Sequence, residues 1–210
     1  MKNFRLLMIL SLSILGVLSA PLGNFGSVGG SAQETIQFMM TPHVEGDLIA
    51  FSYQGDIWLV RRDGTGARRL TNHLARDASP RFSPDGQWIA FSSDRFGNDD
   101  VFVVGVAGGE PRQVTFHTTG DNVEGWTREG RIMFATSRGS HPFYSPLHTV
   151  SPQGDLPLPM DMDQARNAAE SPDGRYLVFN RIGLSTSRKS QKGNRTTDIW
   201  ILDRESGDFT

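Results

Sequence analysis

The sequence contains no cysteine, no marked excess of charge of either sign and only one long apolar run. The absence of cysteine excludes a disulfide scaffold, a thiolate metal site, an iron–sulfur cluster and a cysteine nucleophile. Lysine and arginine number 21 and aspartate and glutamate number 23, which gives a net charge of −2. Nucleic-acid-binding domains normally carry a basic excess, so we expect no nucleic-acid partner.

The apolar run lies at the N-terminus. Lys2 and Arg5 precede the 13 residues from Leu6 to Leu18, and small residues follow up to Ala32. A helix needs roughly 20 residues to cross a bilayer, so this run is too short to span one. A basic start before a short apolar core is typical of a secretory signal. The sequence therefore predicts a signal peptide and short linker over residues 1–32 and an exported, periplasmic or secreted protein. The alternatives are an uncleaved membrane anchor and a buried helix.

The rest of the chain is an internal repeat. A phenylalanine marks the same position in four similar segments, and the spacings between these four residues are 40, 43 and 45. The four are Phe51, Phe91, Phe134 and Phe179. A period near 40–45 residues with several short strands in each unit is the signature of β-propeller blades. The pattern predicts an all-β chain of four-stranded antiparallel blades.

The turns within each repeat have a clear physical logic. Ser-Pro-Asp-Gly occurs at 83–86 and again at 171–174, directly before a strand rich in branched and aromatic residues. Proline fixes φ, aspartate bonds to nearby backbone and glycine tolerates positive φ, so the tetrapeptide favours a tight turn. Asp-Ile-Trp at 56–58 and 198–200 begins the next strand. A second glycine turn and an outer strand with Leu-Thr or Val-Thr follow.

Counting strands predicts about three and three-quarter blades. The first three blades are expected over 35–71, 79–115 and 122–160, and the fourth begins near Ala168. Its outer strand is expected to be missing. Closed propellers have about four to eight complete blades, so residues 33–210 are predicted to be an incomplete propeller from the front of a longer protein. The alternative is a small four-bladed propeller whose last strand comes from the N-terminus.

These repeats resemble the WD40-like (PD40) repeats of TolB, of prolyl-oligopeptidase-type enzymes and of tricorn proteases. Two features favour the tricorn proteases. The run from Thr41 to Trp58, soon after the leader, resembles the start of their first propeller. The insertion from Ser185 to Thr197, directly before the strand at Asp198, resembles a Lys-Gly-rich insertion at the same place. The resemblance covers residues 35–210.

The resemblance implies the N-terminal six-bladed propeller of a serine peptidase. Such proteins continue with a seven-bladed propeller, a PDZ-like module and catalytic domains that supply a Ser-His-Ser/Glu site, so this chain would carry no catalytic residue. An Arg-Arg pair that archaeal members use for a peptide C-terminus is replaced here by Thr-Gly-Asp-Asn at 119–122. The implied role is to guide or filter peptides. The alternative is a stand-alone periplasmic TolB-like scaffold that binds proteins, and a glycan-binding or hydrolytic propeller ranks last.

The insertion also supplies the candidate binding residues. Four cations fall in it with no acid between them, at Arg188, Lys189, Lys192 and Arg195. Such a loop would attract anionic groups or peptide carboxylates. The alternative is a solvated loop with no ligand. The expected partners are peptides or proteins on a propeller face, with a membrane involved only through a retained signal and oligomers only through the parent protein.

Other motifs do not indicate chemistry, and no cofactor or metal is predicted. Ser140 stands beside His141, but adjacency in sequence does not give triad geometry. Asp94, Asp99 and Asp100 lack the spacing of an EF-hand calcium loop. The tryptophans are expected to pack between blades. They are Trp58, Trp88, Trp126 and Trp200.

Overall fold

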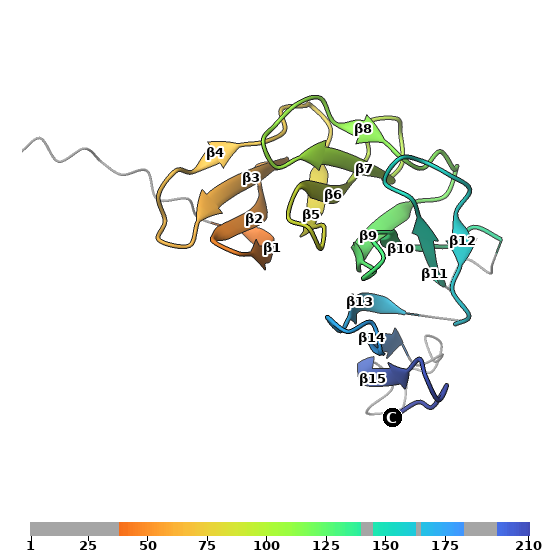
Figure 1. Cartoon of the computed structure of the whole chain (residues 1–210). Helices are drawn as coiled ribbons and strands as arrows, with labels where there is room; N and C mark the ends of the chain where they lie inside the picture. The colour runs from red at the N-terminus through yellow and green to blue at the C-terminus, as the bar shows by residue number, and fades with distance from the viewer. Residues whose placement is uncertain (1–37, 140–144, 163–164, 183–196) are drawn as a thin grey trace, which may run out of the picture. The chain divides into compact units, whose positions relative to one another are not determined.

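The computed structural model describes residues 38–139, 145–162, 165–182 and 197–210 (Figure 1). The chain divides into two compact units, 1–35 and 36–210, and all described residues belong to the second. The predicted signal segment, the Ser140–His141 pair and the insertion with its four cations lie outside the described residues. Among the residues described, no helix is long and apolar enough to cross a bilayer.

The strands form successive antiparallel sheets, and in each sheet the spatial order follows the sequence order. The first sheet contains β1 (Met40–Glu45), β2 (Leu48–Tyr53), β3 (Asp56–Arg61) and β4 (Arg68–Arg69). The second contains β5 (Asp77–Phe82), β6 (Trp88–Ser93), β7 (Asp100–Gly105) and β8 (Arg112–Gln113). The third contains β9 (Asp121–Trp126), β10 (Ile132–Thr136), β11 (Leu147–Val150) and β12 (Leu158–Pro159). The fourth contains β13 (Arg166–Glu170), β14 (Tyr176–Ile182) and β15 (Thr197–Asp203).

This arrangement confirms the predicted propeller blades. Each sheet corresponds to one sequence repeat, and the first strands of neighbouring blades contact one another: β1 with β5, β5 with β9 and β9 with β13. The first strands are therefore the inner strands, and the short β4, β8 and β12 are the outer ones (Figure 1).

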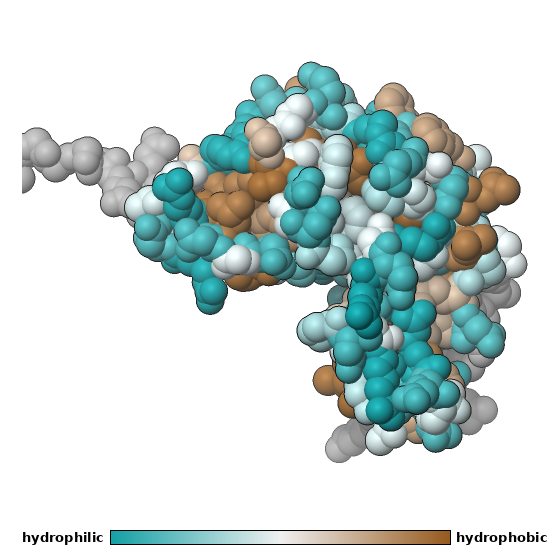
Figure 2. Space-filling model, in the orientation of Figure 1, coloured by the Kyte–Doolittle hydropathy of each residue, from teal (hydrophilic) through white to brown (hydrophobic). Residues whose placement is uncertain are grey.

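The repeated phenylalanines lie at the centres of the second strands. All four are at most 2% exposed, and three clusters of buried apolar residues surround them or their neighbours. Each faces the third residue of an Asp-Ile-Trp-type strand: Phe51 lies opposite Trp58 and Phe91 opposite Phe102. Burying a phenylalanine stabilises a fold by about 1.5–3 kcal/mol, so these positions hold each blade together. Around this core the visible surface is mainly polar with apolar interruptions (Figure 2).

The Ser-Pro-Asp-Gly turns have the predicted chemistry. Asp85 accepts a hydrogen bond from the Gln87 N–H at 3.1 Å, and the Ser83 hydroxyl accepts one from the Trp88 N–H at 3.0 Å. Gly86 has a φ of 66°, which lies in the left-handed region that glycine adopts without strain. The turn therefore fixes the register with which the second strand follows the first.

The inner strands carry a β-bulge that the sequence did not reveal. The register shifts within β1, β5, β9 and β13, so that one extra residue is accommodated in each. At the bulge of three blades a non-glycine residue is left-handed: Thr41, Ser79 and Asn167, with φ of 48°, 55° and 51°. Bulges bend a strand and increase its twist. The repeated strain marks the inner strands as positions where backbone shape is specified.

The fourth sheet has three described strands, and the start of an outer strand is already paired. Phe209 forms an isolated bridge with Leu202, and Thr210 exchanges two backbone hydrogen bonds of 2.9 Å with Ile201. The pairing occupies the position of β4, β8 and β12 in the other blades. The fourth sheet thus has three described strands and the beginning of an outer strand, whereas the strand count predicted that the outer strand would be missing.

The expectation for the tryptophans is only partly met. Trp126 is buried and donates a hydrogen bond of 2.9 Å to the Arg81 carbonyl oxygen in the neighbouring blade. Trp200 packs against the cluster that joins the third and fourth blades. Trp88, in contrast, is 41% exposed at the start of β6, because it follows the Ser-Pro-Asp-Gly turn at the end of the blade. The prediction was wrong for that residue.

Candidate functional site

A buried aspartate at the start of the third strand anchors the outer strand of the first blade. The Asp56 carboxylate pairs with the Arg69 guanidinium and accepts a hydrogen bond of 3.2 Å from the His73 N–H. The Thr71 hydroxyl accepts a 3.0 Å bond from the Ile57 N–H. These bonds join two segments that are more than ten residues apart. We call the aspartate and threonine together the outer-strand clamp.

The second blade repeats this clamp. The Thr115 hydroxyl accepts a bond of 2.9 Å from the Val101 N–H, and Gln113 donates one of 3.0 Å to Asp100. Burial raises the pKa of the Asp100 carboxyl, while a backbone bond from His117 and the side-chain bonds oppose that shift. The clamp residues are almost fully buried in both blades, so each holds its outer strand through interior contacts.

The third blade lacks both members of the clamp. Alignment by strand register places Pro146 where Asp56 and Asp100 stand, and Asp161 where the two threonines stand. Pro159 likewise replaces the arginine or glutamine that bonds to the aspartate. The aspartate and the arginine or glutamine that bonds to it are both replaced, so the third blade has no unpaired carboxylate at the position of Asp56 and Asp100. The outer strand β12 is held with fewer side-chain bonds than β4 and β8.

A second repeated pair joins the start of the inner strand to the residue that follows the second strand. Arg95 Nη2 lies 2.7 Å from Asp77 Oδ2, and this aspartate side chain is fully buried. The Arg95 guanidinium also lies 5.8 Å and 5.3 Å from the ring centroids of Phe91 and Phe102. Aromatic faces attract cations, so the charge is stabilised from two sides.

The third blade keeps this pair but changes its surroundings. Arg138 pairs with the fully buried Asp121 and lies over the ring of Phe134 at 5.3 Å. His148 occupies the position that Phe102 occupies in the second blade. Burial lowers the pKa of His148, and Arg138 lowers it further, while Asp121 opposes the shift. Among the described residues, one buried side-chain atom of each of the three finds no hydrogen-bond partner: Asp121 Oδ1, Arg138 Nε and His148 Nδ1.

Charged residues also link the inner strands of successive blades. His43 Nδ1 accepts a 3.2 Å bond from the Phe82 N–H, and Arg81 Nε donates one of 2.9 Å to the Glu124 carbonyl oxygen. Burial lowers the pKa of His43, with a further contribution from Arg81, and burial raises the pKa of Glu124. The Glu124 carboxylate accepts backbone bonds from Asn167 and Ala168 in the fourth blade. This row ties four blades together near their inner edges.

At the rim, an arginine ties each of the first two outer strands to the next blade. Arg68 on β4 donates a hydrogen bond to the Val106 carbonyl oxygen, and Arg112 on β8 donates one to the Pro152 carbonyl oxygen. Register places Leu158 at the equivalent position of β12. At the boundary between the third and fourth blades, Leu158 therefore cannot make the hydrogen bond that Arg68 and Arg112 make at the first two boundaries.

The residue on the opposite side of that boundary is exchanged as well. The N–H groups of Val106 and Arg204 bond to equivalent carbonyl oxygens of their own blades, at Gln87 and Arg175, so the two residues occupy the same place in the hairpin. At the third boundary the outer strand thus has the aliphatic Leu158 and the hairpin has Arg204. At the first boundary the outer strand has the arginine and the hairpin has the aliphatic residue. Leu158 cannot supply the hydrogen bonds of Arg112 and is 53% exposed.

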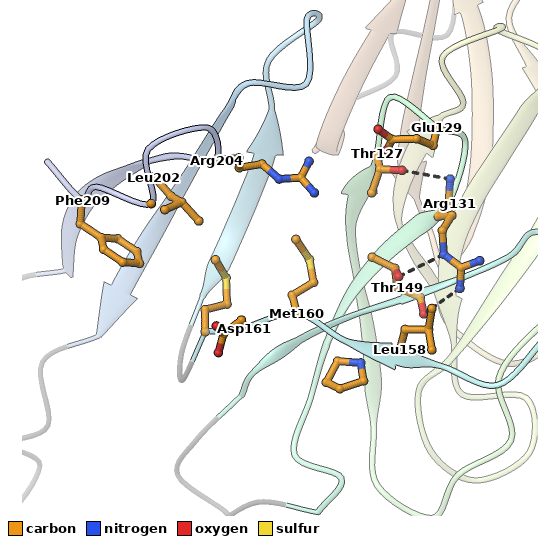
Figure 3. A pocket seen from close by; sticks show the side chains of 13 residues that line it. Thr127, Glu129, Arg131, Thr149, Leu158, Met160, Asp161, Leu202, Arg204 and Phe209 are labelled. Carbon is orange, nitrogen blue, oxygen red and sulfur yellow. Dashed lines mark hydrogen bonds between the residues drawn. The ribbon is translucent and has the colours of Figure 1, made fainter.

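A pocket of about 620 Å³ opens at this boundary (Figure 3). Residues of the third blade and its exit line one side, and residues of β15 and its hairpin line the other. The first side consists of Thr127, Glu129, Arg131, Thr149, Leu158, Pro159, Met160, Asp161 and Met162. The second consists of Leu202, Arg204, Gly207 and Phe209. The volume lies within the roughly 300–1,000 Å³ of small-molecule sites.

Three of the four charged groups in the lining have partners in the chain. Arg131 Nη1 lies 2.9 Å from Asp155, and its Nε donates a 3.1 Å bond to the Thr149 hydroxyl. Arg204 Nη1 lies 2.7 Å from Glu170, whose side chain is 1% exposed. Hydrogen bonds, including one from the Thr127 hydroxyl, lower the pKa of Glu129, so this carboxyl is charged at neutral pH. The pocket therefore combines an apolar lining with these compensated charges and with the Asp161 carboxylate, which has no partner among the described residues.

Sequence reasoning did not identify this pocket, although a signal was present. The signal is the replacement of the rim arginines Arg68 and Arg112 by Leu158. Recognising it requires the strand register of the third blade, and the aspartate and threonine that mark this register in the other repeats are absent there. The histidines at 73 and 117 also repeat with the blade period and were not recognised as a pair.

Of the acidic loop residues, Asp94 accepts a bond of 2.8 Å from the Arg76 N–H. Asp99 pairs with the Arg76 side chain at 3.1 Å.

Comparisons with known proteins agree with the repeat pattern. The chain is 35% identical over 181 residues to tricorn protease homolog 1 of Streptomyces coelicolor, a match that covers 82% of this chain and 16% of that protein. It is 47% identical over 64 residues to a TolB homolog of Chlorobium luteolum, covering 30% of this chain and 15% of that one. This chain thus matches about a sixth of the length of each of these two relatives.

Solved structures show the same fold. The crystal structure of the tricorn protease superposes with a TM-score of 0.68 at 22% identity and covers 84% of this chain and 18% of that one. The structure of putative TolB from Agrobacterium tumefaciens gives a TM-score of 0.64 at 18% identity, over 83% of this chain and 61% of that one. The family described as the tricorn protease N-terminal beta propeller domain matches residues 36–210. This chain therefore belongs to the family of tricorn protease N-terminal β-propeller domains.

Proposed function

We propose that this chain is the N-terminal propeller part of an exported tricorn-like serine protease. In that protein it would guide or filter peptide substrates, while the catalytic domains lie in other parts of the polypeptide. The observation that carries the proposal is the family match over residues 36–210. It is supported by the match of 82% of this chain to only 16% of a tricorn protease homolog, because a propeller of this size is one module of such a protein.

The arrangement of charges favours binding over chemistry. Arg81 and Glu124 bond to backbone groups of neighbouring blades, and Asp77 and Asp121 are each committed to a buried arginine. A group that is locked in such bonds positions backbone and does not turn over substrate. The described residues therefore suit a rigid scaffold that presents loops and pockets to a peptide.

Two further parts of the proposal rest on sequence. The segment 1–32 has the composition of a cleavable export signal, and relatives include TolB proteins of the Tol-Pal system. The cations of the insertion would attract the C-terminal carboxylate of a peptide. They are Arg188, Lys189, Lys192 and Arg195. Guanidinium and ammonium groups on one loop bind carboxylates through charge-assisted hydrogen bonds.

A second candidate function is a free-standing, periplasmic TolB-like scaffold that binds proteins on a propeller face. The local identity of 47% to a TolB homolog favours it. The two candidates differ in the polypeptide that carries this sequence. A tricorn-like protease would be several times heavier than the 23.2 kDa of this chain, whereas a TolB-like scaffold would hold no peptidase domain.

The first experiment is to detect the native polypeptide with an antibody against the hairpin 203–208 and to fractionate the cells. A product several times heavier than this chain, found outside the cytoplasm and able to cleave peptides, is expected. Replacing all four cations of the insertion by glutamine should weaken cleavage of peptides with a free C-terminus more than of C-terminally amidated peptides. A cytoplasmic product, or a light one without peptidase activity that co-purifies with envelope proteins, would overturn the proposal.

A further inference from the structure

We propose that the pocket between the third and fourth blades binds an apolar side chain of an uncharged peptide segment. The inference rests on the proposed function for the class of ligand, and it assigns a site to that function. It starts from the three blade boundaries, which the repeat makes directly comparable. At two of them an arginine on the outer strand bonds to the next blade, whereas at the third, crossing bonds come from Arg128, in the turn between β9 and β10.

The first step is that residues on both sides of the third boundary differ in type from those at the first. Leu158 replaces the arginine of β4 and β8, and Arg204 replaces the aliphatic Val106 of the first boundary. The clamp that holds the outer strand is missing from the same blade, with Pro146 and Asp161 at its positions. The third blade therefore lacks both the outer-strand arginine and the outer-strand clamp, and the pocket lies where both are missing.

The second step concerns the lining. Met160 and Met162 lie between the two blades and are only partly buried, and Leu158 is 53% exposed. In Figure 3, Leu158 lies on the third-blade side of the pocket, Phe209 on the fourth-blade side and Met160 between them. Methionine side chains adapt to irregular apolar partners. Covering these side chains with an apolar group removes their surface from water and stabilises the complex.

The third step concerns charge. Arg131 and Arg204 are held by Asp155 and Glu170, and the acidic Glu129 is held by hydrogen bonds within its own turn. The lining carries two acidic and two basic side chains, so an ion of either sign would meet like charges there, and a neutral ligand would not. A peptide segment with a leucine or phenylalanine side chain and no nearby charge fits both the lining and the edge.

The test uses the full chain with methionine methyl groups labelled with ¹³C. N-acetyl-leucinamide and N-acetyl-phenylalaninamide are titrated in, and the methyl signals of Met160 and Met162 are assigned by replacing each in turn with leucine. We expect both signals to shift with ligand concentration, and the signal of the fully buried Met133 to stay unchanged. N-acetylglycinamide, which has no side chain, should give no shift at the same concentrations.

Two variants separate the pocket from a general apolar effect. Leu158→Arg introduces the residue found at the equivalent place on β4 and β8, and should weaken binding about tenfold or more, which corresponds to about 1.4 kcal/mol. Leu156→Arg makes the same change at a side chain that is 84% exposed and outside the lining, and should bind as the parent does. If Leu158→Arg does not fold, Met162→Gln replaces it, with the same expected loss.

Each outcome decides the inference. Absence of shifts at Met160 and Met162, equal binding of the glycine derivative, or unchanged binding by Leu158→Arg overturns the site. The proposed function fails on a different result, the mass and location of the native polypeptide. If the chain binds the leucine derivative but comes from a free-standing envelope protein, the proposed site stands and the proposed protease function fails. A heavy peptidase without these shifts would do the reverse.

Discussion

Arg95 and Asp77 form a buried ion pair in the second blade, with Arg95 Nη2 2.7 Å from Asp77 Oδ2 and side chains that are 11% and 0% exposed. The pair joins the start of β5 to the residues that follow β6, and the same pair recurs in the third blade as Asp121 with Arg138. Removing one partner leaves the other charge buried and uncompensated, which costs more than the intact pair contributes. The relationship therefore makes the blades sensitive to single substitutions at these sites.

Asp77→Asn should lower the free energy of unfolding by about 3–5 kcal/mol, because the Arg95 guanidinium stays in the interior without its carboxylate. Urea denaturation followed by tryptophan fluorescence measures the change. Asp99→Asn is the matched control, because its partner Arg76 is 57% exposed and such pairs contribute about 0–1 kcal/mol. Equal losses in the two variants would contradict a special role for the buried pair.

Thr115→Val should remove the hydroxyl that accepts the Val101 N–H while keeping the shape of the side chain. A buried amide without a partner costs about 1–3 kcal/mol, so unfolding should occur at lower urea concentration and the Val101 amide should exchange faster. Thr65→Val provides the comparison, since its hydroxyl bonds to Asp63 at an exposed turn. A Val101 amide that exchanges at the parent rate would show that the clamp does not protect it.

Acid should destabilise the protein through its buried histidines. The pKa values of His43 and His148 are lowered by burial, so below about 6.5 the unfolded chain binds more protons than the folded one. Stability is therefore present above the ordinary histidine pKa and is lost as pH falls toward the folded values, by at most about 1.4 kcal/mol per pH unit for each group.

His148→Phe tests this effect at one site. The variant introduces the residue that stands at Phe102 in the second blade, where it faces Arg95. We expect its melting temperature to fall less than that of the parent between pH 7.5 and pH 5.5. The difference between the two proteins isolates His148 from Glu124 and Asp100, whose raised pKa values give the opposite slope at lower pH. Parallel melting curves would show that His148 does not titrate with folding.

Arg112→Leu should loosen the second boundary so that it resembles the third. The arginine is exposed and its acceptor is a single carbonyl oxygen of Pro152, so the expected loss of stability is below about 1 kcal/mol. Hydrogen exchange is the more sensitive measurement, and the amides of Ser151, Gln153 and Gly154 should exchange faster. Arg61→Leu, on another exposed hairpin, should leave those amides unchanged.

The sequence repeat was sufficient to predict the blades, because the phenylalanine register and the turn residues act locally. The left-handed conformations of Thr41 and Ser79 were not predictable from residue type, since neither residue favours positive φ and the bulge is imposed by contacts between inner strands. The buried pair of Arg138 with Asp121 also depends on strand register. The pocket requires both the register and the absence of the rim arginine at Leu158. Features that depend on the residues of a single strand or turn could therefore be predicted from the sequence, and features that depend on contacts between two blades could not.

Three arginines that bond across blade boundaries use other acceptors than the outer-strand clamp does. Within a blade, carboxylates and hydroxyls such as those of Asp56 and Thr71 hold specific partners. Between blades, Arg68, Arg112 and Arg81 donate to backbone carbonyl oxygens, which every residue type provides. These arginine bonds need no compensating mutation in the neighbour when a blade is duplicated or inserted beside a new one. The chemistry of these bonds thus gives a physical reason why such repeats can grow, shrink and recombine during evolution.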